Sequence, residues 1–246
     1  MYDGRVTIYR FCCCGRGGAA REIQTMSAHP ILVVQALEHR YDKRPVLCKL
    51  ALELNEGEHH LLLGPSGSGK TTLIHAISGL LEPDQGSIII DGQPMTGQGA
   101  AARDRLRRDK IGLIFQSLRL VSALTVRDNL RLASRLSGHP ANDDNIDALL
   151  DQVGVGHRAS AKPRLLSQGE AQRAAIARAL VGKPRLLIAD EPTSALDDDN
   201  ARRVASLLLE TADRNGSTLL IATHDERLKA LIPRTVSLVP AGTTVQ

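Results

Sequence analysis

Apolar positions recur along this chain with two different periods. Short apolar or alternating runs, which favour strands, cover residues 31–37, 46–54, 59–63, 87–90, 111–115, 185–190 and 219–222. Longer segments with helix-compatible spacing lie between them, at residues 73–81, 100–110, 124–136, 143–153, 171–180 and 197–213. Strands that alternate with helices in this way predict an α/β fold with a mainly parallel sheet.

The first 25 residues differ from the rest in composition. They contain scattered arginines and glycines and three adjacent cysteines, Cys12, Cys13 and Cys14, but no apolar core of a secretory signal. The cysteine triplet does not match a C-x-x-C zinc spacing, although a metal or lipid site there is the alternative. We expect residues 1–26 to be a disordered or mis-assigned N-terminal extension, and residues 27–246 to form the functional domain.

Composition narrows the classes of partner. No apolar run approaches the roughly 18–20 residues that span a bilayer, so the sequence predicts no membrane crossing by this chain. The formal net charge of +4 comes without a basic run, and aromatic residues make up only 2%, which leaves little for stacking on bases. We therefore expect no nucleic-acid partner. Nothing in the cysteine pattern requires an oxidising compartment, so the cytoplasm is the expected location.

The segment from Gly64 to Thr71 fits the pattern G-x-x-x-x-G-K-[ST] between a buried strand and an apolar helix. Glycines in such a loop let backbone N–H groups surround phosphate oxygens at a helix N-terminus. Lys70 would neutralise the β- and γ-phosphates, and Thr71 would ligate Mg²⁺. The residues expected to bind the nucleotide here are Gly64, Pro65, Ser66, Gly67, Ser68, Gly69, Lys70, Thr71 and Thr72.

A second apolar strand, residues 186–190, ends in two carboxylates. Asp190 would reach the Mg²⁺ shell directly or through water, and Glu191 could act as general base on the attacking water. A strand end of this composition can also be an ordinary solvated one. The phosphate loop upstream favours the catalytic interpretation.

These motifs and several others resemble those of ATP-binding cassette (ABC) ATPases, and they follow one another along the chain in the same order as in that family. The resemblance covers most of residues 31–239. The resemblance implies roles for further residues: adenine stacking by Tyr41, Mg²⁺ contact by Gln116, γ-phosphate binding across a dimer by Ser167 and Gly169, an interface loop at Ser194, Ala195, Leu196 and Asp197, and a switch histidine at His224.

The signature run here is Leu166-Ser167-Gln168-Gly169-Glu170, where the family pattern is Leu-Ser-Gly-Gly-Gln. Ser167 and Glu170 also form a capping-box pattern for the helix that follows, and a capped helix end can still bind an anion. Gly169, where the backbone must approach phosphate, is retained. We expect ATP binding across the interface to survive, with the extra negative charge of Glu170 bearing on its strength.

The resemblance implies a P-loop NTPase (RecA-like) core, an N-terminal antiparallel β subdomain and an inserted helical subdomain at about residues 117–182. It implies ATP and Mg²⁺ as cofactors, a head-to-tail homodimer, and a separate membrane permease docked between Gln116 and Leu166. The subunit would be cytoplasmic and peripheral on the inner face of the inner membrane.

The short form of the chain is most similar to subunits of the lipoprotein-release and macrolide-export group. The alternative is a non-transport ABC ATPase that drives a membrane-bound cell-division or cell-wall partner. A ribosome-associated or nucleic-acid ABC ATPase is disfavoured, because the chain has one cassette and no inserted arm.

Overall fold

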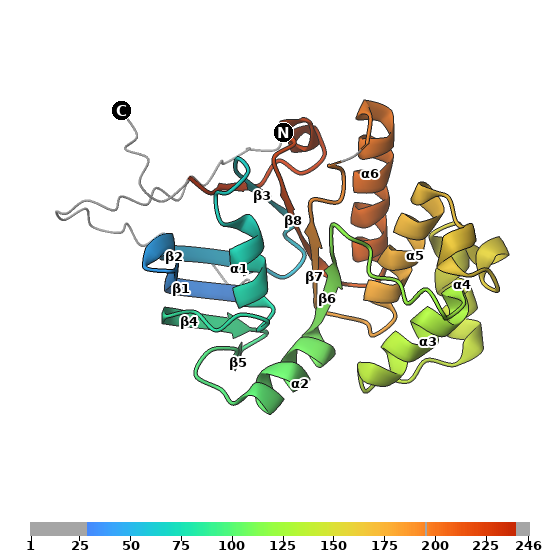
Figure 1. Cartoon of the computed structure of the whole chain (residues 1–246), viewed down its shortest axis with the longest axis horizontal. Coiled ribbons are helices and arrows are strands. Elements are labelled where there is room, and N and C mark those ends of the chain that lie inside the picture. The colour runs from blue at the N-terminus through green and yellow to red at the C-terminus, as the bar shows by residue number, and fades with distance from the viewer. Residues whose placement is uncertain (1–28, 195, 240–246) are drawn as a thin grey trace.

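An antiparallel sheet lies beside one end of a larger α/β unit in the computed structural model, which describes residues 29–194 and 196–239 (Figure 1). The expectation for residues 1–26 falls outside these ranges, as does Ala195. The strands of this sheet have the order β2-β1-β4-β5. Their bounds are β1 Pro30–Tyr41, β2 Arg44–Asn55, β4 Gln85–Ile90 and β5 Gln93–Pro94.

A two-residue turn at Asp42 and Lys43 joins β1 to β2. Both residues have positive φ, 48° and 66°, as a type I′ hairpin turn requires. The register then places Tyr41 opposite Arg44 at the end of the hairpin. This geometry brings the single aromatic residue of the hairpin to the edge that faces the phosphate loop.

The second sheet has the order β6-β7-β8-β3-β9, and every neighbouring pair is parallel. Its strands are β3 His60–Leu63, β6 Ile111–Ile114, β7 Leu186–Asp190, β8 Thr218–Thr223 and β9 Thr235–Ser237. The predicted α/β class, with a parallel core and an antiparallel β subdomain, is confirmed. β9 was not predicted, because three residues are too few to give a periodic signal.

Side chains of the parallel strands alternate between two apolar cores. Leu187 and Ala189 of β7 pack with the helices on one face, whereas Leu186 and Ile188 pack with α1 and the antiparallel sheet on the other. Strands covered on both faces are expected to be continuously apolar, which is what the sequence has in β7 and β8.

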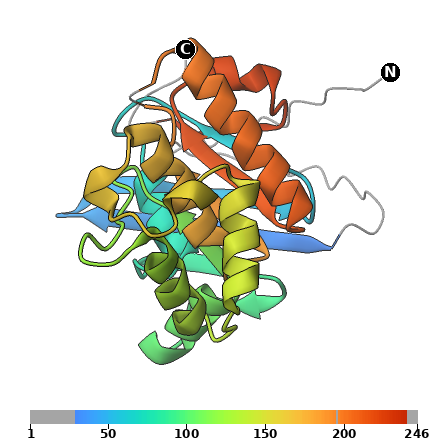
Figure 2. The same cartoon turned by 90° about the vertical axis from the view of Figure 1, so that its right-hand side faces the viewer.

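Helices surround the parallel sheet on both sides (Figures 1 and 2). Figure 2 brings the side with α3, α4 and α5 toward the viewer. The helices are α1 Lys70–Ile77, α2 Ala100–Lys110, α3 Val126–Leu136, α4 Asp143–Gln152, α5 Gln168–Leu180 and α6 Asp198–Arg214. Short 3-10 helices cover Gly156–Arg158, Pro163–Leu165 and Glu226–Ala230.

Two helices, α1 and α5, depart from their predicted ends by three residues or more. α1 begins at Lys70 and stops at Ile77, where the hydroxyl of Ser78 donates to the carbonyl of Ile74 at 2.7 Å. α5 begins at Gln168, three residues before the predicted start, because Ser167 serves as its N-cap.

No helix in the described part of the chain is long and apolar enough to cross a membrane.

Candidate functional site

The phosphate loop follows the carboxyl end of β3 and leads into α1. Gly69, its last residue before the helix, has φ 97°, and a Cβ there would lie 3.1 Å from the side chain of Val46. Gly64 also lacks room, since a Cβ would lie 2.6 Å from the Leu238 carbonyl oxygen. Both glycines are therefore required by close packing and, for Gly69, by backbone conformation.

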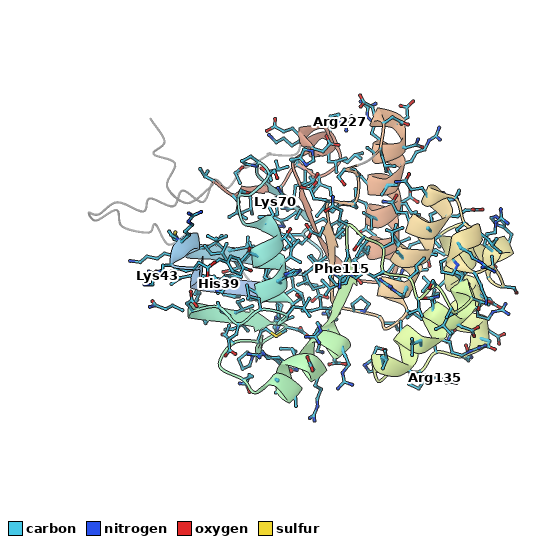
Figure 3. The ribbon with its side chains drawn as sticks, viewed as in Figure 1. His39, Lys43, Lys70, Phe115, Arg135 and Arg227 are labelled. Atoms are coloured by element: carbon cyan, nitrogen blue, oxygen red, sulfur yellow. The ribbon has the colours of Figure 1, made fainter. Side chains whose placement is uncertain are left out.

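The N-terminus of α1 carries no side-chain cap and no acidic residue in its first turn. Its first backbone N–H groups have no carbonyl partner within the helix, so they can bind an anion. Lys70 begins this helix, as Figure 3 shows. Its buried ammonium donates to the carbonyls of Gly64 at 2.7 Å and Pro65 at 3.1 Å, which holds the cation over the loop.

Asp190 and Thr71 meet behind the loop. The Thr71 hydroxyl donates to Asp190 Oδ2 at 3.1 Å, and burial raises the pKa of Asp190 despite this hydrogen bond. Asp190 Oδ1 is buried without a hydrogen-bond partner among the described residues. A buried carboxylate oxygen with an unused acceptor beside a hydroxyl is a donor set that fits Mg²⁺.

Glu191 is held in an unusual backbone conformation next to Asp190. Its φ of 48° is in the left-handed region, and its N–H donates to the Ala222 carbonyl at 2.8 Å. The carboxylate lies 3.3 Å from Lys70 Nζ and accepts from His224 Nδ1 at 2.9 Å. A carboxylate only accepts, so Nδ1 carries the proton. Such backbone strain persists at sites where the surrounding structure fixes a side chain.

One cavity of about 580 Å³ collects most of these residues. It is lined by Tyr41, Val46, Pro65, Ser66, Gly67, Gly69, Lys70, Thr71, Thr72, Gln116, Glu191, Ser194 and His224. Tyr41 and Val46 come from the β1–β2 hairpin, and the other residues follow the carboxyl ends of β3, β6, β7 and β8, which is the edge where ligands bind parallel α/β sheets. Gly64, Ser68 and Asp190 lie behind this surface rather than on it.

Tyr41 stands at the rim of the cavity, 48% exposed. The His39 ring packs edge-on against it, with centroids 4.7 Å apart. Val46, on the neighbouring strand, also lines the cavity and was not predicted. Val46 lies two residues after Arg44, the register partner of Tyr41, so a predicted hairpin register could have identified it.

Gln116 and Ser194 approach each other across the cavity, with Gln116 Nε2 donating to Ser194 Oγ at 3.3 Å. Beside Gln116, the guanidinium of Arg119 lies over the Phe115 ring at 4.4 Å, and Figure 3 shows Phe115 at the end of β6. Phe115 therefore packs within the loop that follows β6.

The signature residues do not line the cavity. Ser167 and Gly169 lie at the N-terminus of α5, where Ser167 Oγ accepts from the Glu170 N–H at 3.3 Å and Glu170 Oε2 accepts from the Ser167 N–H at 2.8 Å. The capping box is thus present. The site in this one chain consists of the phosphate loop and its neighbours, with the signature outside.

The phosphate loop, the paired acidic residues and the parallel core define a nucleotide-binding protein of the P-loop class. The family described as ABC transporter matches residues 47–194, so the chain belongs to that family.

Individual relatives cover most of the chain. It is 40% identical to the lipoprotein-releasing system ATP-binding protein LolD of Hydrogenovibrio crunogenus, over 84% of this chain and 94% of that protein. It is 39% identical to the methionine import ATP-binding protein MetN of Mesorhizobium japonicum, over 85% of this chain and 58% of that protein. A bacterial ABC transporter cassette solved as a dimer superposes with a TM-score of 0.76 at 30% identity, covering 84% and 94% of the two chains.

Proposed function

We propose that this subunit binds ATP with Mg²⁺ in the cavity and hydrolyses it to drive a separate membrane permease. The observation that carries the proposal is the meeting of Lys70, Glu191 and His224 in one cavity, next to the buried carboxylate of Asp190. Relatives named as transport subunits favour this function over a cell-division or cell-wall role.

The proposed roles follow from the contacts. Lys70 and the N-terminus of α1 bind the phosphates, and Tyr41 stacks on the base. Thr71, Asp190 and Gln116 hold Mg²⁺, which neutralises phosphate charge when bound. Glu191 accepts the proton of the attacking water, and His224 orients the Glu191 carboxylate through its Nδ1–H.

Two copies would complete each other's sites. Ser167 and Gly169 lie outside the cavity of their own chain, so they can serve the nucleotide of a second copy. We infer a head-to-tail homodimer that closes on two ATP molecules and opens after hydrolysis. The dimeric relative supports this arrangement.

The permease would dock on the helical subdomain, which we place at about residues 117–182. Apolar side chains are exposed there at Val121, Leu132 and Leu136. A subunit of this kind works on the cytoplasmic face of the inner membrane. The LolD relative supports lipoprotein release as the transport group, and identifying the co-purified membrane partner tests that assignment.

Replacing Glu191 with Gln tests the mechanism. The variant should bind ATP normally, lose hydrolysis by about 100-fold or more because the general base is gone, and accumulate as an ATP-bound dimer. Light scattering and phosphate release, on the chain alone and with its permease, measure both effects. ADP is the control and should leave the variant monomeric. A monomer with ATP, or normal hydrolysis, contradicts the role of Glu191.

A further inference from the structure

Glu170 directs both carboxylate oxygens back into its own chain. Oε2 closes the capping box with the Ser167 N–H at 2.8 Å, and Oε1 accepts from Arg158 Nε at 2.7 Å. His157 Nε2 is 3.4 Å from the same Oε1. The Glu170 side chain is 11% exposed, whereas that of Arg158 is 43% exposed.

The charge of Glu170 is fixed by these contacts. The hydrogen bond from the Ser167 backbone, followed by that from Arg158, lowers the pKa of Glu170 to about 2. The residue is therefore an anion at neutral pH. An anion three residues into α5 stabilises the helix, but it opposes the approach of a phosphate to the same helix end.

Arg158 offsets that opposition. A guanidinium at hydrogen-bond distance from Glu170 balances the carboxylate charge, so the N–H groups at the start of α5 again face a ligand with little net repulsion. The family pattern has a neutral glutamine at this position, which needs no such partner.

Arg158 also connects α5 to α3. It ends the 3-10 helix Gly156–Arg158, and the loop after it is fastened to the start of α3. The Val126 N–H donates to the Ala161 carbonyl and the Arg127 N–H to the Ala159 carbonyl, each at 2.9 Å. The side chain thus joins the helix that carries Leu132 and Leu136 to the helix that carries the signature.

We propose that Arg158 is a positioning residue of the signature half-site. It neutralises the charge of Glu170 and holds the N-terminus of α5 against the loop 159–161, which bonds to the start of α3. Ser167 and Gly169 are then placed to bind the γ-phosphate of the ATP held by a second copy. This inference rests on the proposed head-to-tail dimer. Nucleotide binding to the phosphate loop of the same chain does not depend on Arg158.

The test uses the full chain with Glu191→Gln, in which ATP drives dimerisation measured by light scattering. Arg158→Ala should raise the ATP concentration needed for half-maximal dimerisation by about fivefold or more, in the range of couplings between sites. ADP affinity should not change. Arg164→Ala is the matched control, because Arg164 is exposed in the same α4–α5 connection and forms no ion pair within the described residues. It should leave both quantities unchanged.

A second substitution separates charge balance from a general structural role. Glu170→Gln retains the capping box and removes the negative charge. Adding it to Arg158→Ala should restore the ATP requirement of the Glu191→Gln parent. If Arg158→Ala alone also loses ADP binding, the comparison is made in the Glu170→Gln background. The neutral side chain there needs no counter-charge, so adding Arg158→Ala should leave the ATP requirement for dimerisation unchanged.

Two outcomes overturn this inference without contradicting the proposed dimer. In the first, Arg158→Ala dimerises at the same ATP concentration as the Arg164→Ala control. In the second, Glu170→Gln fails to restore the dimerisation that Arg158→Ala weakens. A Glu191→Gln protein that stays monomeric at every ATP concentration contradicts the proposed dimer and this inference together.

Discussion

The two helix N-termini proposed to contact ATP are built in opposite ways. α1 starts after a glycine at φ 97° and has no side-chain cap and no acid in its first turn. α5 starts after Ser167, whose capping box with Glu170 already satisfies backbone groups of the helix end. The first end leaves its N–H groups to a ligand. The N-terminus of α5 has fewer unbonded N–H groups, so it is suited to a phosphate that another copy already holds.

The largest expected effect comes from the α1 end. Lys70→Ala removes the only side-chain cation that lines the cavity within the described residues. We expect ATP hydrolysis to fall by about 100-fold or more, as for loss of one preorganised donor, and ATP binding to the single chain to weaken. Phosphate release and equilibrium binding measure the two quantities.

The control for this change is Lys162→Ala, an exposed lysine near the α5 end. It should hydrolyse ATP at the parent rate. Equal losses in both variants would show that the effect reflects general charge and not the phosphate loop.

A matched pair of glycines sharpens the comparison. Gly69→Ala should lower the free energy of unfolding by about 1–2 kcal/mol, because alanine is strained in the left-handed region and its Cβ meets Val46. Gly169 lies within α5, and a Cβ there meets only Arg173 Nη1, at an ordinary 3.6 Å. Gly169→Ala should therefore raise the free energy of unfolding by about 0.5 kcal/mol.

Function should change differently from stability. Although Gly169→Ala stabilises the monomer, it should weaken ATP-driven dimerisation in the Glu191→Gln background, because its Cβ occupies space that the phosphate of the second copy needs. Urea unfolding and light scattering on the same samples test this. The contrast between the two helix ends would be contradicted if both alanine substitutions lowered the free energy of unfolding, or if Gly169→Ala left ATP-driven dimerisation unimpaired.

The smallest effect concerns pH. Burial raises the pKa of Asp190, so the folded chain binds that proton more tightly than the unfolded chain. Stability contributed by Asp190 is therefore lost as pH rises from the ordinary carboxyl range through the raised pKa. The Asp190→Asn side chain cannot titrate. Without nucleotide, the free energy of unfolding of this variant should exceed that of the parent, and the difference should be largest at pH values above the raised pKa.

Urea unfolding across the acidic and neutral range measures the difference. The gain from Asp190→Asn should shrink as pH falls below the window. Asp197→Asn is a useful contrast, because hydrogen bonds from Asn200 lower the pKa of Asp197 and predict the opposite sign. A pH-independent difference for Asp190→Asn would contradict the burial argument.

Much of the candidate site could be predicted because its residues follow strands of one parallel sheet. Gln116, Glu191 and His224 are far apart in sequence, yet parallel strands bring their carboxyl ends to a single edge. Apolar strands and phosphate-loop spacing were enough to indicate Lys70, Asp190 and Glu191, whereas Gln116 and His224 came from the family resemblance. The role of Tyr41 came from family resemblance, and only the hairpin register shows how it reaches the rim.

Other features depend on tertiary packing and leave no local pattern. The sequence indicates the extra negative charge of Glu170, but its pairing with Arg158 twelve residues upstream requires the 3-10 helix that ends at Arg158. The positive φ of Glu191, where β7 has ended but its N–H still bonds to the Ala222 carbonyl on the neighbouring strand, likewise leaves no local sequence signal.

Tyr41 at the rim has a practical consequence for spectroscopy. The chain has no tryptophan, and Tyr41 is the one tyrosine among the residues that the structure describes. Its half-exposed ring gives a fluorescence signal that base stacking would change, on top of the emission of Tyr2 and Tyr9, the other two tyrosines of the chain. In a complex with a membrane partner, all indole emission would come from that partner, so the partner could be followed separately from this chain without any label.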